Sequence, residues 1–362
     1  MPVKFFVSKD PSGKEWPPDN SHETLAAIDI CRRLWQAFES QEKLFVLLAN
    51  LHRPNADIVL LTNHGIGIIE LKHYYGQITL SQDGGWYAGK TRMGAGTMGA
   101  RNPHEQVQKY ADSVRKKVIS PAPNVQWLAG RRSDWPNYKF QTAVCFTHPD
   151  AMLTSFRELI RKSNILNFED WENFSILVPS EVTAWGASLR FEVQKGSNEG
   201  YEPNRLDPAG IIKIVTSLFN CKEWTEIIHL MPSGEPYAHL SIIEKGQHTA
   251  TFALDRDDIL VGRNVQACHV ALPDVYSNAS RTHCRIIRKA DGIFIKDSNS
   301  TNGTFVDGER VQGMFKLGHH HQVTLGGPVA GAKVCLLDFA VQEESLLGNS
   351  LNMSTEKKTS QH

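Results

Sequence analysis

Asp297-Ser298-Asn299-Ser300-Thr301-Asn302-Gly303-Thr304 is the stretch that decides the fold of the C-terminal part of this 362-residue chain. Two earlier polar clusters, Gly262-Arg263 and Ser280-Arg281-Thr282-His283, complete its pattern. From residue 239 onward, short β-type segments alternate with turn residues about every ten residues, which is the spacing of a β-sandwich. The loops of a sandwich gather at its two ends, so we expect the three polar clusters to lie together at one end.

The three clusters contain the groups that a phosphate needs. A phosphate monoester carries nearly two negative charges and several acceptor oxygens, and proteins meet it with arginine, hydroxyl and backbone N–H groups. Arg263, Ser280 and Arg281 supply such groups, and Asn302 can bind the backbone of a peptide ligand. Any one of these residues could instead be turn chemistry, since Asn-Gly is a common hairpin turn. The joint pattern is much more specific than its parts.

By these residues, the stretch 240–340 resembles a forkhead-associated (FHA) domain. The resemblance implies a phosphothreonine-containing protein as partner and Arg263, Ser280, Arg281 and Asn302 as the binding residues. We expect His283 to brace the Ser280 loop internally rather than to meet the ligand. The loop of residues 274–279 is longer than is usual before the serine. His319-His320-His321 are expected to be solvated loop histidines rather than metal ligands, because consecutive residues cannot all face one ion.

A second constellation lies upstream, where Asp57 is followed thirteen residues later by Glu70-Leu71-Lys72. Residues 57–61 and 67–72 read as two strands joined by a hairpin turn. Strand side chains alternate, so Glu70 and Lys72 share a face, and Asp57 reaches it if the register allows. Two adjacent carboxylates suit a hard cation such as Mg²⁺ or Mn²⁺, and Lys72 could then orient or deprotonate water or stabilise developing charge. The alternative is a solvated strand edge with incidental charges.

The surroundings favour the metal site. Gln106 and Tyr110 are spaced to share one face of the helix predicted for residues 102–119. Glu42 is expected on a preceding helix, read here as residues 22–51, and would add a third carboxylate. The stretch from Ser40 to Val114 resembles a nuclease-related (NERD) domain of the PD-(D/E)XK superfamily. The resemblance implies a restriction-endonuclease-like α/β fold and an active nuclease, with Asp57 and Glu70 as metal ligands, Lys72 as the catalytic lysine, and Gln106 and Glu42 in support.

The composition is that of an ordinary globular protein. Apolar residues make up 41% and charged residues 22%, and the 39 basic and 39 acidic residues give a formal net charge of zero. A nucleic-acid surface must therefore be a local patch. Candidates gather near the glycine-rich loop and the following helix, where a solvated helix face is the competing interpretation: Arg92, Arg101, Lys109, Arg115, Lys116 and Lys117. Six scattered cysteines without a C-x-x-C pair fit a reducing cytoplasm, and no membrane span is expected.

The sequence thus predicts a cytoplasmic, bacterial, two-domain protein. We expect the nuclease-related domain at 1–230, a linker at 231–238, the FHA domain at 239–341 and a disordered tail at 342–362. Further strands are expected at 77–80, 85–87, 140–146 and 175–178, and a helix at 208–230. The expected activity is Mg²⁺- or Mn²⁺-dependent hydrolysis of nucleic acid, with DNA favoured, recruited by phosphothreonine binding. The alternative is a non-catalytic adaptor whose nuclease-like fold only binds DNA or protein.

Overall fold

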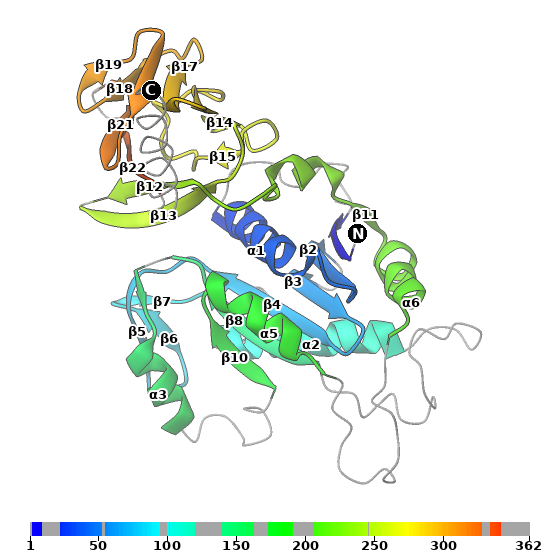
Figure 1. Ribbon diagram of the computed structural model, residues 1–362. Helices are drawn as coiled ribbons and strands as arrows, with labels where there is room; N and C mark the ends of the chain where they lie inside the picture. The colour runs from blue at the N-terminus through cyan, green and yellow to red at the C-terminus, as the bar shows by residue number, and fades with distance from the viewer. Residues whose placement is uncertain are drawn as a thin grey trace, which may run out of the picture. The chain divides into compact units, whose positions relative to one another are not determined.

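Two compact units, with the boundary between Ile228 and His229, make up the computed structural model (Figure 1). It describes residues 2–8, 22–52, 55–94, 100, 102–119, 140–148, 150–162, 173–190, 206–244, 246–327 and 334–341. The predicted tail at 342–362 lies outside these residues. None of the helices in the described part is long and apolar enough to cross a membrane.

The first unit is an α/β domain built on a mixed sheet. Its described strands form a seven-stranded sheet in the order β10-β8-β4-β3-β2-β1-β11. The strands are β1 (Val3–Ser8), β2 (Phe45–His52), β3 (Asn55–Thr62), β4 (Ile66–Lys72), β8 (Gln141–Phe146), β10 (Phe174–Leu177) and β11 (Cys221–Glu223). A smaller sheet contains β5 (Gly76–Leu80), β6 (Trp86–Ala88), β7 (Thr91–Arg92) and β9 (Ala151–Met152).

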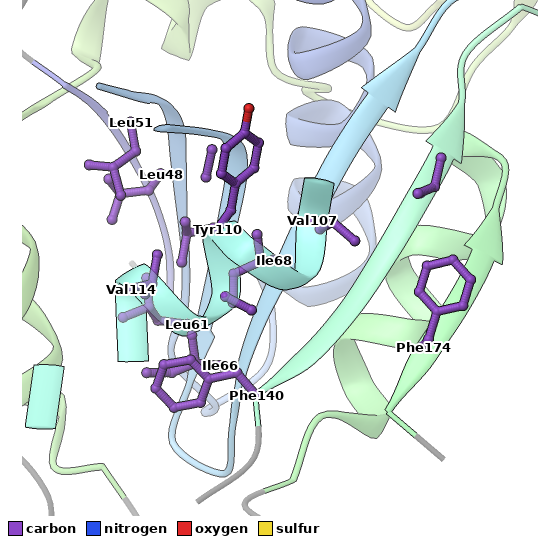
Figure 2. Close-up of a cluster of buried hydrophobic side chains, with 14 of the residues drawn as sticks. Leu48, Leu51, Leu61, Ile66, Ile68, Val107, Tyr110, Val114, Phe140 and Phe174 are labelled. Atoms are coloured by element: carbon purple, nitrogen blue, oxygen red, sulfur yellow. The ribbon is translucent and has the colours of Figure 1, made fainter. Parts of the chain in front are cut away.

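Helices pack on this framework. They are α1 (His22–Phe38), α2 (Pro103–Ile119), α3 (Thr154–Lys162), η2 (Pro179–Glu181), α5 (Val182–Ser188), α6 (Pro208–Lys213), η3 (Ile214–Leu218) and η4 (Thr225–Leu230). Helix α2 begins as predicted, because the Asn102 side chain accepts a hydrogen bond from the Glu105 N–H (2.9 Å) and Pro103 is the first helical residue. The apolar face of α2 covers one face of the sheet, in a buried cluster that contains Val107, Tyr110, Val114, Leu61, Ile66 and Ile68 (Figure 2).

Two predicted helices are wrong in part. The helix predicted at 22–51 ends at Phe38, and residues 45–52 form strand β2 instead. Strand β2 lies between β1 and β3, and consecutive residues of both its faces are buried, so its continuous apolar run has the same apolar positions as a helix. The helix predicted at 208–230 ends at Leu218, and residues 221–223 pair antiparallel with β1 at the edge of the sheet.

The second unit is the predicted β-sandwich. Among the described residues, one sheet has the order β13-β12-β22-β21-β18-β19 and the other β15-β14-β16-β17-β20. Their bounds are β12 (Ala238–Glu244), β13 (Gln247–Leu254), β14 (Asp258–Gly262), β15 (Val270–Ala271), β16 (Cys284–Lys289), β17 (Gly292–Asp297), β18 (Thr304–Val306), β19 (Glu309–Arg310), β20 (Met314–Leu317), β21 (His321–Leu325) and β22 (Cys335–Val341). Apolar side chains from both sheets form one core, which includes Leu240, Val261, Ile286, Ile295 and Phe339.

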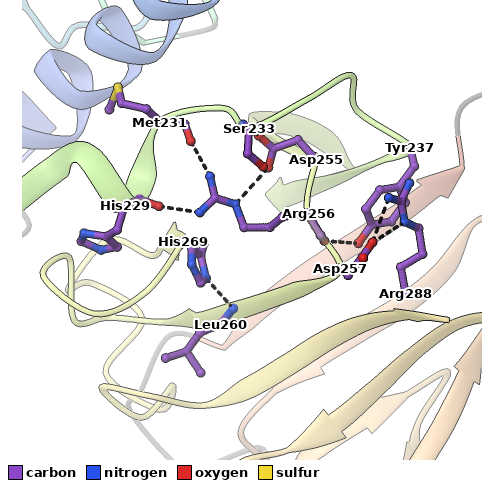
Figure 3. Close-up of polar contacts among 10 residues, drawn as sticks. All are labelled: His229, Met231, Ser233, Tyr237, Asp255, Arg256, Asp257, Leu260, His269 and Arg288. Atoms are coloured by element: carbon purple, nitrogen blue, oxygen red, sulfur yellow. Dashed lines mark hydrogen bonds and ion pairs between the residues drawn. The ribbon is translucent and has the colours of Figure 1, made fainter. Parts of the chain in front are cut away.

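The predicted linker segment 231–238 is held by the second unit (Figure 3). Arg256 donates hydrogen bonds to the carbonyls of His229 (2.7 Å) and Met231, and Ser233 N–H donates to Asp255 Oδ2 (2.7 Å). These contacts fix the chain immediately before β12 begins.

Candidate functional site

The hairpin of β3 and β4 brings the two predicted metal ligands together. Ile58 pairs with Ile69, so Asp57 stands opposite Glu70. Both side chains lie on the sheet face that packs against α2, since they alternate in step with Val59 and Ile68. The Leu71 N–H donates to Asp57 Oδ2 (2.7 Å) and orients that carboxylate. The strand register therefore places Asp57 on the same sheet face as Glu70, as the predicted metal site requires.

Burial makes this carboxylate pair costly without a cation. Glu70 is only 3% exposed, and its Oε2 atom has no hydrogen-bond partner. Burial raises the pKa of Asp57 well above its usual range, and the facing Glu70 charge raises it further. Burial also raises the pKa of Glu70, and the Lys72 ammonium, together with the facing Asp57 carboxyl group, offsets this only in part. The unpartnered buried oxygen and the close pair of carboxylates fit the oxygen ligand set of a hard divalent cation.

Lys72 is held at the same face by two partners. Its Nζ donates to Glu70 Oε1 (2.6 Å) and to Gln106 Oε1 (3.4 Å). Gln106 in turn donates from Nε2 to the Tyr110 hydroxyl (2.8 Å), one turn further along α2. Burial alone would lower the pKa of Lys72, but the Glu70 carboxylate more than offsets this and the pKa is raised. Sequence spacing thus predicted correctly that Gln106 and Tyr110 would share a helix face at the site.

The predicted helical position of Glu42 is wrong. Glu42 lies exposed on the bend between α1 and β2. The helical carboxylate whose charge reaches the site is Glu23, in the first turn of α1, which raises the pKa of both Asp57 and Glu70. The predicted role of Glu42 rests on the helix predicted at 22–51 and on the resemblance to the nuclease-related family, whereas α1 ends at Phe38, before Glu42.

Three histidines, which sequence reasoning missed, gather beside the site where β4 and β8 end. The His22 and His73 rings are stacked with their centroids 3.8 Å apart, and the centroid of His148 lies 4.9 Å from that of His73. Burial, with His22 and His148 as neighbours, lowers the pKa of His73 to about 4, so its ring is neutral at pH 7. No group of three or more His, Cys, Asp or Glu side chains in the described part of the chain is arranged to hold a metal ion.

The predicted basic patch is partly neutralised where the structure describes it. Arg92 lies 3.6 Å from an Asp83 carboxylate oxygen, and Arg115 lies 3.5 Å from one of Asp112. Arg101 lies outside the described residues. The phosphate-contacting role of this patch stays a prediction.

In the second unit, the three polar clusters meet at one end of the sandwich. Arg263 follows β14, and its Nε donates to the Ala279 carbonyl (2.7 Å) while an Nη donates to Asp274 Oδ1 (2.9 Å). Ser280 Oγ accepts a hydrogen bond from the Thr301 N–H (3.0 Å), which joins the second cluster to the third. Asn302 Nδ2 donates to the Asn278 carbonyl (3.1 Å). The arginine, the hydroxyl and the amide are thus held on loops that contact one another, and Arg281 is exposed beside them.

His283 braces these loops, as predicted. Its ring is fully buried, and burial lowers its pKa below the usual range. Nδ1 accepts from the Ser280 N–H (2.8 Å), so Nε2 carries the proton and donates to the Gly303 carbonyl (3.1 Å). The neutral imidazole therefore ties the second cluster to the third.

Gly262 allows the first loop to approach the second. A Cβ at Gly262 would lie 2.3 Å from the carbonyl oxygen of Arg281. This distance is too short for any residue that has a side chain. At the turn of the third cluster, Gly303 has a φ of +82°, a conformation that favours glycine. Elsewhere in this unit, His320 Nδ1 lies 3.3 Å from Asp338 Oδ2 while its own side chain is exposed, in keeping with the prediction of solvated histidines.

Comparisons with known proteins agree with both units. The nuclease-related domain family (NERD) matches residues 29–147, and the FHA domain family matches residues 259–326. No curated protein matches the chain. Similar solved structures include the FHA domain of the CT664 protein from Chlamydia trachomatis, with 25% identity, a TM-score of 0.25, and coverage of 29% of this chain and 97% of that one. Another is the N-terminal FHA domain of Rad53p from S. cerevisiae in complex with a phosphothreonine peptide, with 22% identity, a TM-score of 0.26, and coverage of 30% and 95%.

The α/β unit with its facing carboxylates and the β-sandwich with its braced polar loops each coincide with one matched family. The chain therefore contains a nuclease-related domain followed by an FHA domain.

Proposed function

We propose that this protein is a metal-dependent nuclease that hydrolyses nucleic-acid phosphodiesters, with DNA as the favoured substrate, and that its FHA domain directs it to a phosphothreonine-containing protein. The observation that carries the nuclease proposal is the buried Glu70 carboxylate, which leaves one oxygen unpartnered while facing Asp57 across the β3–β4 hairpin. Removing a carboxylate from water without a compensating partner costs several kcal/mol, on the order of the penalty for a buried ion. A cation between the two carboxylates offsets that cost.

Asp57 and Glu70 are the residues that would hold Mg²⁺ or Mn²⁺. When bound, such an ion acts as a Lewis acid on phosphoryl oxygen and lowers the pKa of its water. Lys72 already donates to Glu70 and Gln106, so its ammonium stands beside the metal ligands with a third N–H able to donate to a phosphoryl oxygen. Gln106 presents its carbonyl oxygen to Lys72 because its amide nitrogen is engaged by Tyr110, which keeps the lysine oriented.

The FHA half of the proposal rests on the three joined loops. Arg263, Ser280 and Arg281 supply the cationic and hydroxyl groups for a phosphate, and Asn302 supplies an amide for the peptide backbone. Two of these groups are engaged inside the loops by backbone carbonyls, which limits their side-chain freedom before a ligand arrives. The phosphothreonine peptide in the Rad53p complex is a ligand of the corresponding chemical class.

A second candidate function is a non-catalytic adaptor in which the nuclease fold only binds DNA or protein. It is favoured by one observation, that the described residues contain no group of three side chains arranged for a metal. The two functions differ in whether Glu70 and Lys72 are required for bond cleavage.

The test is cleavage of labelled single- and double-stranded DNA and RNA by the full chain, with Mg²⁺, Mn²⁺ or EDTA. We expect metal-dependent cutting that falls about 100-fold or more in Glu70→Gln and Lys72→Ala proteins. Lys43→Ala, at an exposed position of the same unit, is the matched control and should cut normally. Cutting retained in both site variants would refute the assignment. If the wild type does not cut with or without a phosphothreonine peptide library, the adaptor reading is favoured.

A further inference from the structure

A row of aromatic rings, formed by His22, His73, His148 and Tyr75, lies next in the chain to the proposed catalytic Lys72 and reaches the protein surface. His22 stacks on His73 with an interplanar angle of 12°, His73 contacts His148, and the centroid of Tyr75 lies 5.4 Å from that of His148. His73 follows Lys72 directly in the chain. The row therefore includes the residue that directly follows β4, next in the chain to the proposed catalytic Lys72.

The outer end of the row is exposed and apolar. Tyr75 is 70% exposed, the most exposed of the large apolar side chains in the described residues, and Met152 is 65% exposed. Met152 lies in β9, which pairs with β5, and Tyr75 directly precedes β5, so these two exposed side chains come from neighbouring segments. The exposed ring of Tyr75 is accessible to a base that stacks on it.

Hydrogen bonds fix the row to the end of the sheet. The Thr147 N–H donates to the Lys72 carbonyl (3.0 Å), and Thr147 Oγ1 is hydrogen-bonded to His73 Nδ1 (2.9 Å). His148 Nδ1 accepts from the Asp150 N–H (3.1 Å), which holds the ring against which Tyr75 lies. Tyr75 is three positions after Lys72, so their Cα atoms are at most about 11 Å apart. A group bound on Tyr75 is thus within a few nucleotides of the scissile bond.

We propose that this row is a base-stacking platform, and that the substrate of the nuclease-related domain is a single strand or an unpaired end whose base lies on Tyr75. The inference rests on the proposed nuclease function and adds the substrate class. Inside a duplex both faces of each base are covered by neighbouring bases, whereas a single strand offers its base faces to aromatic side chains. Every base has such a face, so the platform predicts little sequence preference.

Charge supports the same assignment. A neutral, partly buried His73 makes the inner part of the row an aromatic stack rather than a cationic phosphate clamp. The Asp150 carboxylate lies 4.0 Å from His148 Nδ1, and its negative charge disfavours the binding of a phosphate beside His148. The exposed end of the row, Tyr75, can therefore stack on a base but offers no positive charge to the phosphates of the nucleic-acid backbone.

The experiment measures binding without cleavage, in the full chain carrying Lys72→Ala. Fluorescein-labelled single-stranded DNA and a blunt duplex of the same sequence are titrated in Mg²⁺, and Kd is read from anisotropy. We expect Tyr75→Ala to weaken single-strand binding about tenfold, which corresponds to roughly 1.4 kcal/mol, and to change duplex binding less than about twofold. Tyr75→Phe should bind like the parent protein, and Tyr75→Leu should bind like Tyr75→Ala, since a leucine is apolar but cannot stack.

Leu159→Ala, at an exposed apolar position on α3, is the matched control and should leave both affinities unchanged. Thermal unfolding of each variant verifies that it is folded. An equal loss for single strand and duplex, an unchanged Kd in Tyr75→Ala, or no binding of either probe by the parent would overturn the inference. Metal-dependent cutting by the wild type together with an unchanged Tyr75→Ala affinity would leave the nuclease proposal intact. Single-strand binding that depends on Tyr75, without any cutting by the wild type, would refute the nuclease proposal and leave the base-stacking proposal intact.

Discussion

Replacing Gly262 by alanine tests whether the phosphate-binding loops depend on a backbone approach that only glycine allows. The new Cβ would lie 2.3 Å from the Arg281 carbonyl oxygen, 2.9 Å from its carbonyl carbon and 3.0 Å from the His283 nitrogen. All three are backbone atoms, so no side chain can rotate away to relieve the clash. Because a carbon and an oxygen are in ordinary contact at about 3.3 Å, the Arg281 loop must retreat by about 1 Å.

The retreat acts on two backbone hydrogen bonds. Asn264 N–H donates to the Arg281 carbonyl (2.9 Å), and His283 N–H donates to the Val261 carbonyl (2.8 Å). Each contributes about 1 kcal/mol net, with a few tenths returned because alanine restricts the unfolded chain more than glycine does. We expect the free energy of unfolding of this unit to fall by about 2 kcal/mol. Phosphothreonine binding should weaken at least about tenfold, since Ser280 and Arg281 lie on the displaced loop.

Urea denaturation and titration with a phosphothreonine peptide library measure the two effects. Gly234→Ala is the matched control in the same unit, because a Cβ there meets only the Asp255 carbonyl oxygen at an ordinary 3.7 Å. It should change the free energy of unfolding by less than about 1 kcal/mol. Equal stability of the Gly262 and Gly234 variants would refute the reasoning, because the close approach would then have no energetic consequence.

Three further outcomes are expected. Asp274→Asn removes the carboxylate that already engages Arg263 (2.9 Å) and would repel a phosphate, so phosphopeptide affinity measured by calorimetry should rise about two- to fivefold, in keeping with an exposed ion pair. His269 accepts a hydrogen bond from the Leu260 N–H (2.9 Å), and burial, together with the neighbouring Arg256 and His229, lowers its pKa to about 4. Because the unfolded value is about 6.5, the unfolded chain takes up the proton first, so the free energy of unfolding should decrease as pH falls from about 6.5 towards 4, and less steeply in His269→Asn. Mg²⁺ at about ten times its Kd should stabilise the wild type by about 1.4 kcal/mol, with EDTA reversing the shift and Glu70→Gln abolishing it, as read from the melting temperature.

Local sequence patterns predicted an element correctly where they are typical of only one structure. The β3–β4 hairpin follows from two apolar runs around Thr62-Asn63-His64-Gly65, and the start of α2 follows from Asn102-Pro103. The three polar clusters of the sandwich were predicted to meet, and the Ser280–Thr301 hydrogen bond shows that the second and third do.

Local patterns failed where burial on both sides removed the periodicity. Strand β2 is apolar at consecutive positions because the residues on both of its faces are buried, and such a run can be read as a helix. Strand β11 is only three residues long, and it exists because β1 offers it an edge. Neither segment carries enough local information to choose its own conformation.

The sequence by itself determined the two domain types, their order and the shared face of Glu70 and Lys72, because alternation and turn residues act over a few positions. The register that sets Asp57 opposite Glu70 came from the structure. Only the tertiary structure decided that Glu23, on α1, is a helical carboxylate whose charge raises the pKa of Asp57 and Glu70, and that His22, His73 and His148 form a row with Tyr75. These groups come from α1, from the end of β4 and from the end of β8, which are distant along the chain. They meet because the parallel pairing of β4 with β8 aligns the carboxyl ends of both strands, and the stack of His22 on His73 places the start of α1 there as well.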